Sequence, residues 1–168
     1  RTQITREQFE ARQAAARKRR QATMSQAEVP VIIVPWGSSS VSHGTVSTFE
    51  TIRRWVKSTG VKAIVRRAEP MGTHYLEPQV DIIMSGQPRV SYAHITAEKV
   101  PELLESVIRG NDMRPDLAVC VYGIDEWDGA ELGLKGIPAA KELDFWKLQQ
   151  RIVTRNLGYI DPESIDDY

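Results

Sequence analysis

The sequence predicts an α/β domain whose small sheet contains both parallel and antiparallel strands. Short apolar runs bounded by glycine or proline alternate with longer segments whose apolar residues recur at helical spacing. Their order along the chain is strand, helix, strand, strand, strand, helix. A helical crossover predicts a parallel pair and a tight turn predicts an antiparallel pair, so we expect a mixed sheet covered by helices.

The first segment is predicted to be a basic helix. Thr5 and Gln8 form a capping-box pattern that opens a helix running to about Ala22. Its apolar stripe consists of little more than Phe9 and alanines, so the helix is expected to fray or to lie on a partner. Residues 1–20 carry seven basic residues against two acidic ones, a net charge of +5.

The core elements follow in order. The apolar runs predict strands at 31–34, 63–65, 80–84, 89–93 and, as an additional strand, 117–122. Helical spacing predicts helices at 45–58 and 96–109, which end at Gly60 and Gly110. Loops are expected at 36–44 and 123–138, and mixed coil and helix at 139–157. This order of elements is the thioredoxin-like arrangement.

The composition excludes several classes of protein. Lys plus Arg and Asp plus Glu both number 22 in the 168 residues, so the whole chain does not favour nucleic acid or an anionic membrane. Cys120 is the single cysteine, which rules out a disulfide framework and favours a reducing, cytoplasmic compartment. No apolar run approaches the ~20 residues of a membrane span, so we expect no membrane insertion.

The two ends suggest that the chain belongs to a longer protein. It begins with Arg1 rather than Met, and residues 161–168 have the Asp-Pro start and acidic first turn of a new helix. We therefore expect a basic N-terminal helix at 1–28, a thioredoxin-like domain at 29–123, and an extension at 124–168 that leads to a further domain. Residues 139–168 are expected to order mainly against something outside the core.

Two stretches resemble a known family. Glu77-Pro78 followed by Gly86-x-Pro88-x-Val90-x-Tyr92 resembles a hairpin of the NADH-binding flavoprotein subunit of NADH dehydrogenases and of bidirectional or electron-bifurcating hydrogenases. Residues 149–168 resemble the stretch that leads into the flavin domain of that subunit. The resemblance implies a ferredoxin-type domain of the [2Fe–2S] thioredoxin-like class, placed before a flavin domain.

The resemblance also implies where cluster ligands would stand, and this chain has no cysteine at any of the four positions. They correspond to Ser39, Gly44, Pro70 and His74. Gly44 and Pro70 have no donor atom, and thiolates are the ligands that suit these clusters. We therefore expect no cluster, no other cofactor and no catalytic residue in this chain. The parent protein is implied to carry FMN, NAD(H) and a four-iron cluster, on residues that this chain lacks.

These features together predict a structural or docking module rather than an enzyme. Its expected partners are the flavin domain of the same parent and neighbouring redox subunits, with no nucleic acid. One alternative is a working redox module with unusual or shared metal ligands. The other is an independent binding module that acts through the basic helix.

Several residues invite a chemical interpretation that the sequence does not favour. Ser38, Ser39 and Ser40 with His43 resemble a nucleophile and base, but a polar loop before a helix explains them better. His43, His74 and His94 lack metal-ligand spacing. Trp36, Trp127 and Trp146 are expected to be interface anchors or parts of a satellite core. Cys120 is expected to be buried, with Val119 and Val121 on the opposite face of its strand.

Overall fold

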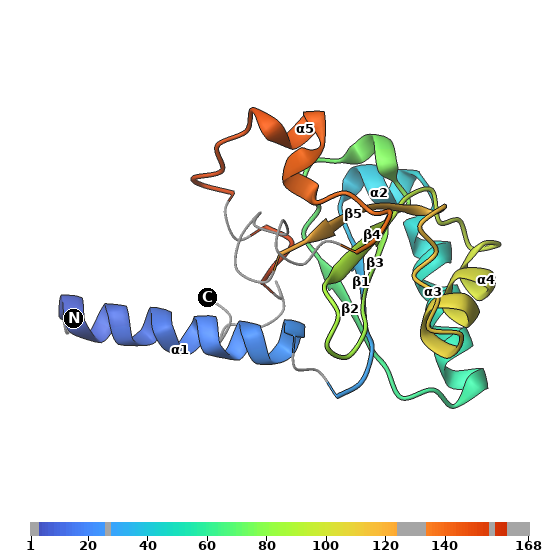
Figure 1. The fold of residues 1–168 in the computed structure, drawn as a ribbon, viewed down its shortest axis with the longest axis horizontal. Helices are drawn as coiled ribbons and strands as arrows, with labels where there is room; N and C mark the ends of the chain where they lie inside the picture. The colour runs from blue at the N-terminus through green and yellow to red at the C-terminus, as the bar shows by residue number, and fades with distance from the viewer. Residues whose placement is uncertain (1–3, 26–27, 124–133, 155–156, 161–168) are drawn as a thin grey trace.

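The chain forms a five-stranded mixed sheet (Figure 1). The computed structural model describes residues 4–25, 28–123, 134–154 and 157–160. The strands are β1 (Val31–Pro35), β2 (Ile64–Ala68), β3 (Val80–Ile83), β4 (Arg89–Tyr92) and β5 (Ala118–Tyr122). Their spatial order is β2-β1-β3-β4-β5, with β1 and β2 parallel and every other pair antiparallel. This topology confirms the predicted thioredoxin-like α/β class.

Two helices cover the first face of the sheet. α3 (Thr45–Thr59) ends at Gly60, whose φ of +68° is the left-handed conformation expected of a helix-terminating glycine. The predicted helix at 96–109 is divided: α4 (Val100–Leu104) starts later, with Pro101 in its first turn. It then widens into the π-helical turn η2 (Glu105–Arg109), where the Gly110 N–H donates to the Glu105 carbonyl at 2.9 Å.

The core under these helices is continuous. It consists of one side of the sheet and the inner sides of α3 and α4, and its largest fully buried members include Ile32, Ile52, Ile82, Tyr92, Leu103 and Leu104. In the predicted helix at 45–58, helical spacing places Val46, Phe49, Ile52 and Trp55 on one apolar side. Phe49, Ile52 and Trp55 are buried, as that spacing predicts, whereas Val46 is 42% exposed.

The second face of the sheet is covered by the C-terminal extension. Ala140 in η4 (Ala140–Glu142), Trp146 in α5 (Asp144–Lys147) and Tyr159 are buried against Val31, Ile33, Cys120 and Tyr122. The expectation that this segment orders mainly outside the core is therefore wrong for these three residues. Their burial supplies the second apolar layer that a sheet apolar on both faces requires. The predicted domain boundaries at 28 and 123 stay predictions.

The N-terminal helix is present and stands apart from the sheet. α1 (Arg6–Ser25) begins with the predicted capping box, in which the Gln8 N–H donates to Thr5 Oγ1 and the Thr5 N–H to Gln8 Oε1. Figure 1 shows it extending away from the domain. Within the described ranges, no helix has the length and apolar character needed to cross a bilayer. Residues 124–133, including Trp127, and the predicted helix start at 161–168 lie outside the described residues.

Candidate functional site

The four positions singled out by the sequence lie on the loops that follow the two parallel strands β1 and β2. Ser39 is in a short helix, α2 (Ser38–Ser42), where the sequence predicted a loop. Gly44 is the residue before α3 and has a φ of +90°. Pro70 follows β2, and His74 starts the single turn η1 (His74–Leu76). The carboxyl ends of parallel strands are the usual location of binding sites in α/β folds.

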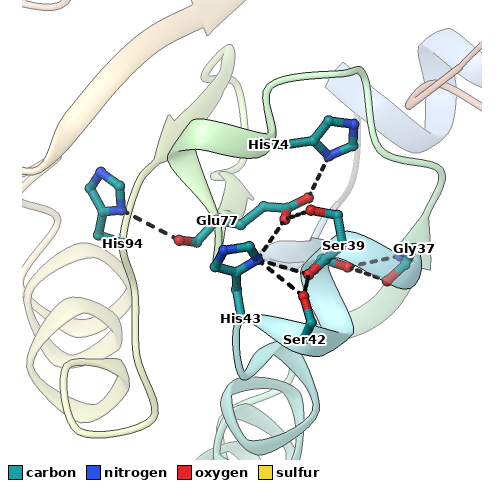
Figure 2. Close-up of polar contacts among 8 residues, drawn as sticks. Gly37, Ser39, Ser42, His43, His74, Glu77 and His94 are labelled. Carbon is teal, nitrogen blue, oxygen red and sulfur yellow. Dashed lines mark hydrogen bonds and ion pairs between the residues drawn. The ribbon is translucent and has the colours of Figure 1, made fainter.

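The structure brings two of the four residues together through a third residue, Glu77 (Figure 2). The Glu77 side chain is only 3% exposed. Ser39 Oγ donates to Glu77 Oε2 at 2.7 Å, and His74 Nδ1 lies 3.0 Å from Glu77 Oε1. A second ring, His43, places its Nδ1 3.4 Å from Oε2. Each carboxylate oxygen therefore has an imidazole beside it, and the buried acid is satisfied by the protein itself.

Local serine chemistry explains why α2 forms. Ser40 Oγ accepts from the Gly37 N–H at 2.8 Å and donates to the Gly37 carbonyl at 2.9 Å, which closes the first turn. Ser42 Oγ donates back to the Ser39 carbonyl at 2.7 Å. His43 Nδ1 is 2.9 Å from the same carbonyl, which fixes the ring beside Glu77. None of these contacts depends on apolar periodicity, so the pattern that predicts helices could not find this one.

Pro70 and Gly44, the other two positions, shape the backbone and have no side-chain atom that could bind a metal. The Pro70 ring lies against Gly37: a Cβ added to Gly37 would stand 2.9 Å from Pro70 Cγ. At Gly44 a Cβ would meet no other atom within 4 Å. Pro70 therefore packs the loop after β2 onto the start of α2, and Gly44 supplies the left-handed turn between α2 and α3.

This donor set does not fit a two-iron cluster. Two of the four positions have no donor atom, and the hydroxyl and imidazole at the other two are already bonded to Glu77. In the part of the chain that the structure describes, no group of three His, Cys, Asp or Glu side chains is arranged to hold a metal ion. The arrangement stabilises the loops and leaves no thiolate for electron transfer.

The serine and histidine geometry also does not make a nucleophile. Ser39 Oγ donates directly to a carboxylate, with no imidazole between them to accept the proton as a general base. Ser42 Oγ lies 3.4 Å from His43 Nδ1 but is committed to the Ser39 carbonyl at 2.7 Å. His94 is turned to the Glu77 backbone, with Nδ1 3.4 Å from its carbonyl oxygen.

The single thiol is buried at a separate place. Cys120 is 1% exposed on the second face of the sheet, and burial raises its pKa to about 12. Val121 lies on the first face, as predicted. Val119 does not: a register shift between β4 and β5 leaves it on the same side as Cys120, so that prediction is wrong.

A buried ion pair that the sequence analysis missed lies on the same face. Arg89 donates to Asp81 through both Nε and Nη2, and the two side chains are 3% and 0% exposed. Gln79 Nε2 donates to Asp81 Oδ1 at 3.1 Å. Burial disfavours the charged guanidinium, but Asp81 outweighs that effect and the pKa of Arg89 lies above its ordinary value. The sequence did contain a signal for this pair: Asp81 is the one acidic residue in an apolar strand, and Arg89 is the one basic residue in the next strand of the hairpin.

Arg89 also holds the C-terminal extension in place. Its Nη1 donates to the Gly158 carbonyl, and its guanidinium lies 5.1 Å from the Tyr122 ring centroid and 5.8 Å from that of Tyr159. One side chain thus links two strands of the sheet to the segment that covers them.

The extension also carries exposed apolar side chains. Leu148, Ile152 and Val153 are 95%, 75% and 97% exposed, and we call them the apolar loop. Trp146, which is close to the apolar loop in sequence, is instead buried in the core on the second face of the sheet. Trp36 packs edge-on against Phe49, with the Arg67 guanidinium 3.9 Å above its ring. Trp36 and Trp146, which the sequence predicted to be interface anchors or parts of a satellite core, therefore both pack against other side chains of this chain.

Comparison with known proteins gives structural similarity alone. The chain is similar to the thioredoxin-like [2Fe–2S] ferredoxin from Aquifex aeolicus, with 16% identity and a TM-score of 0.47, over 56% of this chain and 94% of the ferredoxin. A cysteine-to-serine variant of that ferredoxin gives 16% identity and a TM-score of 0.46, over 54% and 97% of the two chains. No family model matches the sequence, and no curated protein does. The fold class follows from the strand order and pairing of this chain.

Proposed function

We propose that this chain is a non-catalytic docking module of an NADH-dehydrogenase-type flavoprotein subunit. Its parent would oxidise or reduce NAD(H) through FMN and iron–sulfur clusters that other domains carry. The observation that supports this most strongly is the network around Glu77. Two positions where the resemblance implies cluster ligands, Ser39 and His74, are bonded to a buried carboxylate of the same chain.

The position of the thiol supports the same proposal. Redox chemistry of a cysteine requires an accessible thiolate, and both burial and the raised pKa of Cys120 oppose one. Cys120 lies in the core on the second face of the sheet, under the C-terminal extension, and not on the loops that carry Ser39 and His74.

The apolar loop is the surface through which we expect this docking to occur. Three aliphatic side chains that are at least 75% exposed lie within six residues, and two of them fall in the stretch 149–168 that resembles the segment before the flavin domain. Exposed apolar patches of this kind mark interaction sites. We therefore assign the flavin domain of the same parent as the partner of the apolar loop.

The test is association with an FMN-binding domain of this type supplied in trans, measured by calorimetry. Leu148→Asp combined with Val153→Asp is expected to weaken association at least about tenfold, because two buried aliphatic side chains are lost from the interface. Val46→Asp, a change of the same kind at an exposed position on α3, should leave it unchanged. Equal affinities for both variants and the original chain would reject the docking surface.

The exposed α1 favours one second candidate, a binding module that acts through the basic helix. Ile4 and Phe9 are 48% and 49% exposed, and residues 5–15 are exposed along the helix. Deleting residues 1–24 separates the two proposals. Retained binding to the flavin domain supports docking through the apolar loop, and lost binding supports the helix.

A further inference from the structure

The strand β2 forms an open edge of the sheet. It is the last strand in the order β2-β1-β3-β4-β5, and β1 is its neighbour. The opposite edge is different, because Ala139 forms a parallel bridge with Val121 and so continues the pairing beyond β5. Across the described ranges, no segment pairs with the outer side of β2. Edge strands left open in this way are ready templates for pairing with another chain.

The hydrogen bonds to β1 define which backbone groups of β2 are available. The Ile64 N–H donates to the Pro30 carbonyl at 2.9 Å, and the Ala68 carbonyl accepts from the Trp36 N–H at 2.8 Å. Successive residues of a strand direct their N–H and C=O groups to opposite sides. Ile64, Arg66 and Ala68 therefore bond to β1, while Val65 and Arg67 direct an N–H and a C=O each away from the sheet.

The chain segment that leads from the middle of α3 to β2 is basic. The stretch 53–67 contains six basic residues and no acidic one: Arg53, Arg54, Lys57, Lys62, Arg66 and Arg67. The first four are exposed; Arg53 has an exposed ion pair with Glu50 at 3.7 Å, and Arg54, Lys57 and Lys62 add further positive charge. Arg67 is held over Trp36 by its cation–π contact at 3.9 Å. The register places Val65 and Arg67 on the face of the sheet that α3 covers, since they pair with Ile32 and Val34.

We propose that β2 binds an extended acidic segment of a partner protein by strand addition. The backbone groups of Val65 and Arg67 would supply the ladder, and acidic side chains at alternate positions of the peptide would face the cations of α3. This inference goes beyond the proposed docking through the apolar loop and does not depend on it, because the edge and its charge exist whatever the loop binds.

The positive charge of the segment 53–67 and the outward backbone groups of β2 together favour an acidic peptide over other partners. A second copy of the chain, pairing edge to edge, would bring two basic surfaces together. A nucleic acid would match the charge, but its phosphates only accept hydrogen bonds and cannot pair with alternating N–H and C=O groups. An acidic peptide in extended conformation satisfies both requirements.

The experiment measures binding of a fluorescein-labelled peptide of alternating Glu and Val residues by anisotropy, and maps it by amide hydrogen exchange. We expect slower exchange at the Val65 and Arg67 amides, with the Ile64 and Arg66 amides unchanged because β1 already protects them. Val65→Pro, which removes an outward N–H and no bond to β1, should weaken binding roughly tenfold or more. Val65→Thr is the matched control that keeps the N–H.

A charge variant keeps the test decisive if Val65→Pro perturbs folding. Lys57→Glu with Lys62→Glu changes two exposed side chains, and we expect it to abolish binding of the Glu/Val peptide while thermal unfolding stays cooperative. The corresponding Lys/Val peptide should not bind the original chain. Three results would overturn the proposal: binding without protection of the Val65 and Arg67 amides, equal binding by Val65→Pro, or self-association of the chain through this edge.

Discussion

Removing Arg89 is expected to be the most destabilising single change on the second face of the sheet. In Arg89→Met, Asp81 would remain fully buried and, among the residues that the structure describes, would keep the Gln79 amide as its one side-chain donor. Leaving a buried charge without its partner costs about 3–5 kcal/mol of unfolding free energy. The substitution also removes the bond to the Gly158 carbonyl and the contacts with Tyr122 and Tyr159. Because neither side chain is exposed, solvent screening does not reduce this cost.

The assay is urea denaturation followed by circular dichroism, with the thermal midpoint as a second readout. A loss of that size corresponds to a midpoint about 10 °C lower for a chain of this length. Arg109→Met is the matched control, because its ion pair with Glu105 is more than half exposed on both sides and should contribute at most about 0.5 kcal/mol.

A double substitution separates the ion pair from general packing. Asp81→Leu with Arg89→Met removes both charges, so the buried acid is no longer unpaired, and most of the lost stability should return. If Arg89→Met changed stability by less than about 1 kcal/mol, the claim that Asp81 depends on Arg89 would be refuted.

Three further predictions concern the same side of the molecule. Native Cys120 should react slowly with iodoacetamide, and Cys120→Ala should cost on the order of 1 kcal/mol; rapid native labelling would contradict its burial. Unfolding free energy should fall above pH 9, because burial raises the pKa of Cys120 to about 12 from 9.0 and also raises the pKa of Tyr122 and Tyr159. The contribution of these raised pKa values to the unfolding free energy is fully present below pH 9. It is lost as pH rises toward 12, by up to about 1.4 kcal/mol per pH unit for each group. An unfolding free energy that stays constant above pH 9 in urea titrations would contradict this prediction. Gly158→Ala should cost about 1–3 kcal/mol and speed proteolysis of the extension, since its φ is +80° and a Cβ would stand 2.6 Å from Met71 Cγ; unchanged proteolysis would show that this contact does not hold the segment.

The spacing of apolar residues predicted most of the fold, because that spacing decides which sides of the strands and helices are buried. The strands from Val31 onward and the helix α3 were found from buried apolar spacing, and Gly60 marked a real helix end. The helix α2 was missed because serine side chains and the Gly37 backbone form it, with little apolar burial. The cover on the second face was missed because Trp146 lies in α5, a helix of four residues, and Tyr159 lies in a turn, and both elements are too short for an apolar period to be detected.

The candidate site could be predicted only in its parts. The resemblance placed Ser39 and His74 in one set of ligand positions, but it gave no reason to expect Glu77 between them. Ser39 and Glu77 are 38 positions apart, and only the arrangement of the loops after β1 and β2 brings them within 2.7 Å. Long-range pairing of this kind depends on the tertiary fold, which local propensity does not determine.

The central claim is that the loops after β1 and β2 hold a closed polar network instead of a metal cluster. Anaerobic reconstitution with ferrous iron and sulfide, followed by iron and sulfide analysis and a visible spectrum, tests it most directly. We expect a colourless protein without bound iron, because Ser39 and His74 are bonded to Glu77 and the other two positions have no donor. About two iron and two sulfide per chain, with ferredoxin-type visible absorption, would contradict the account and favour a redox module with unusual ligands.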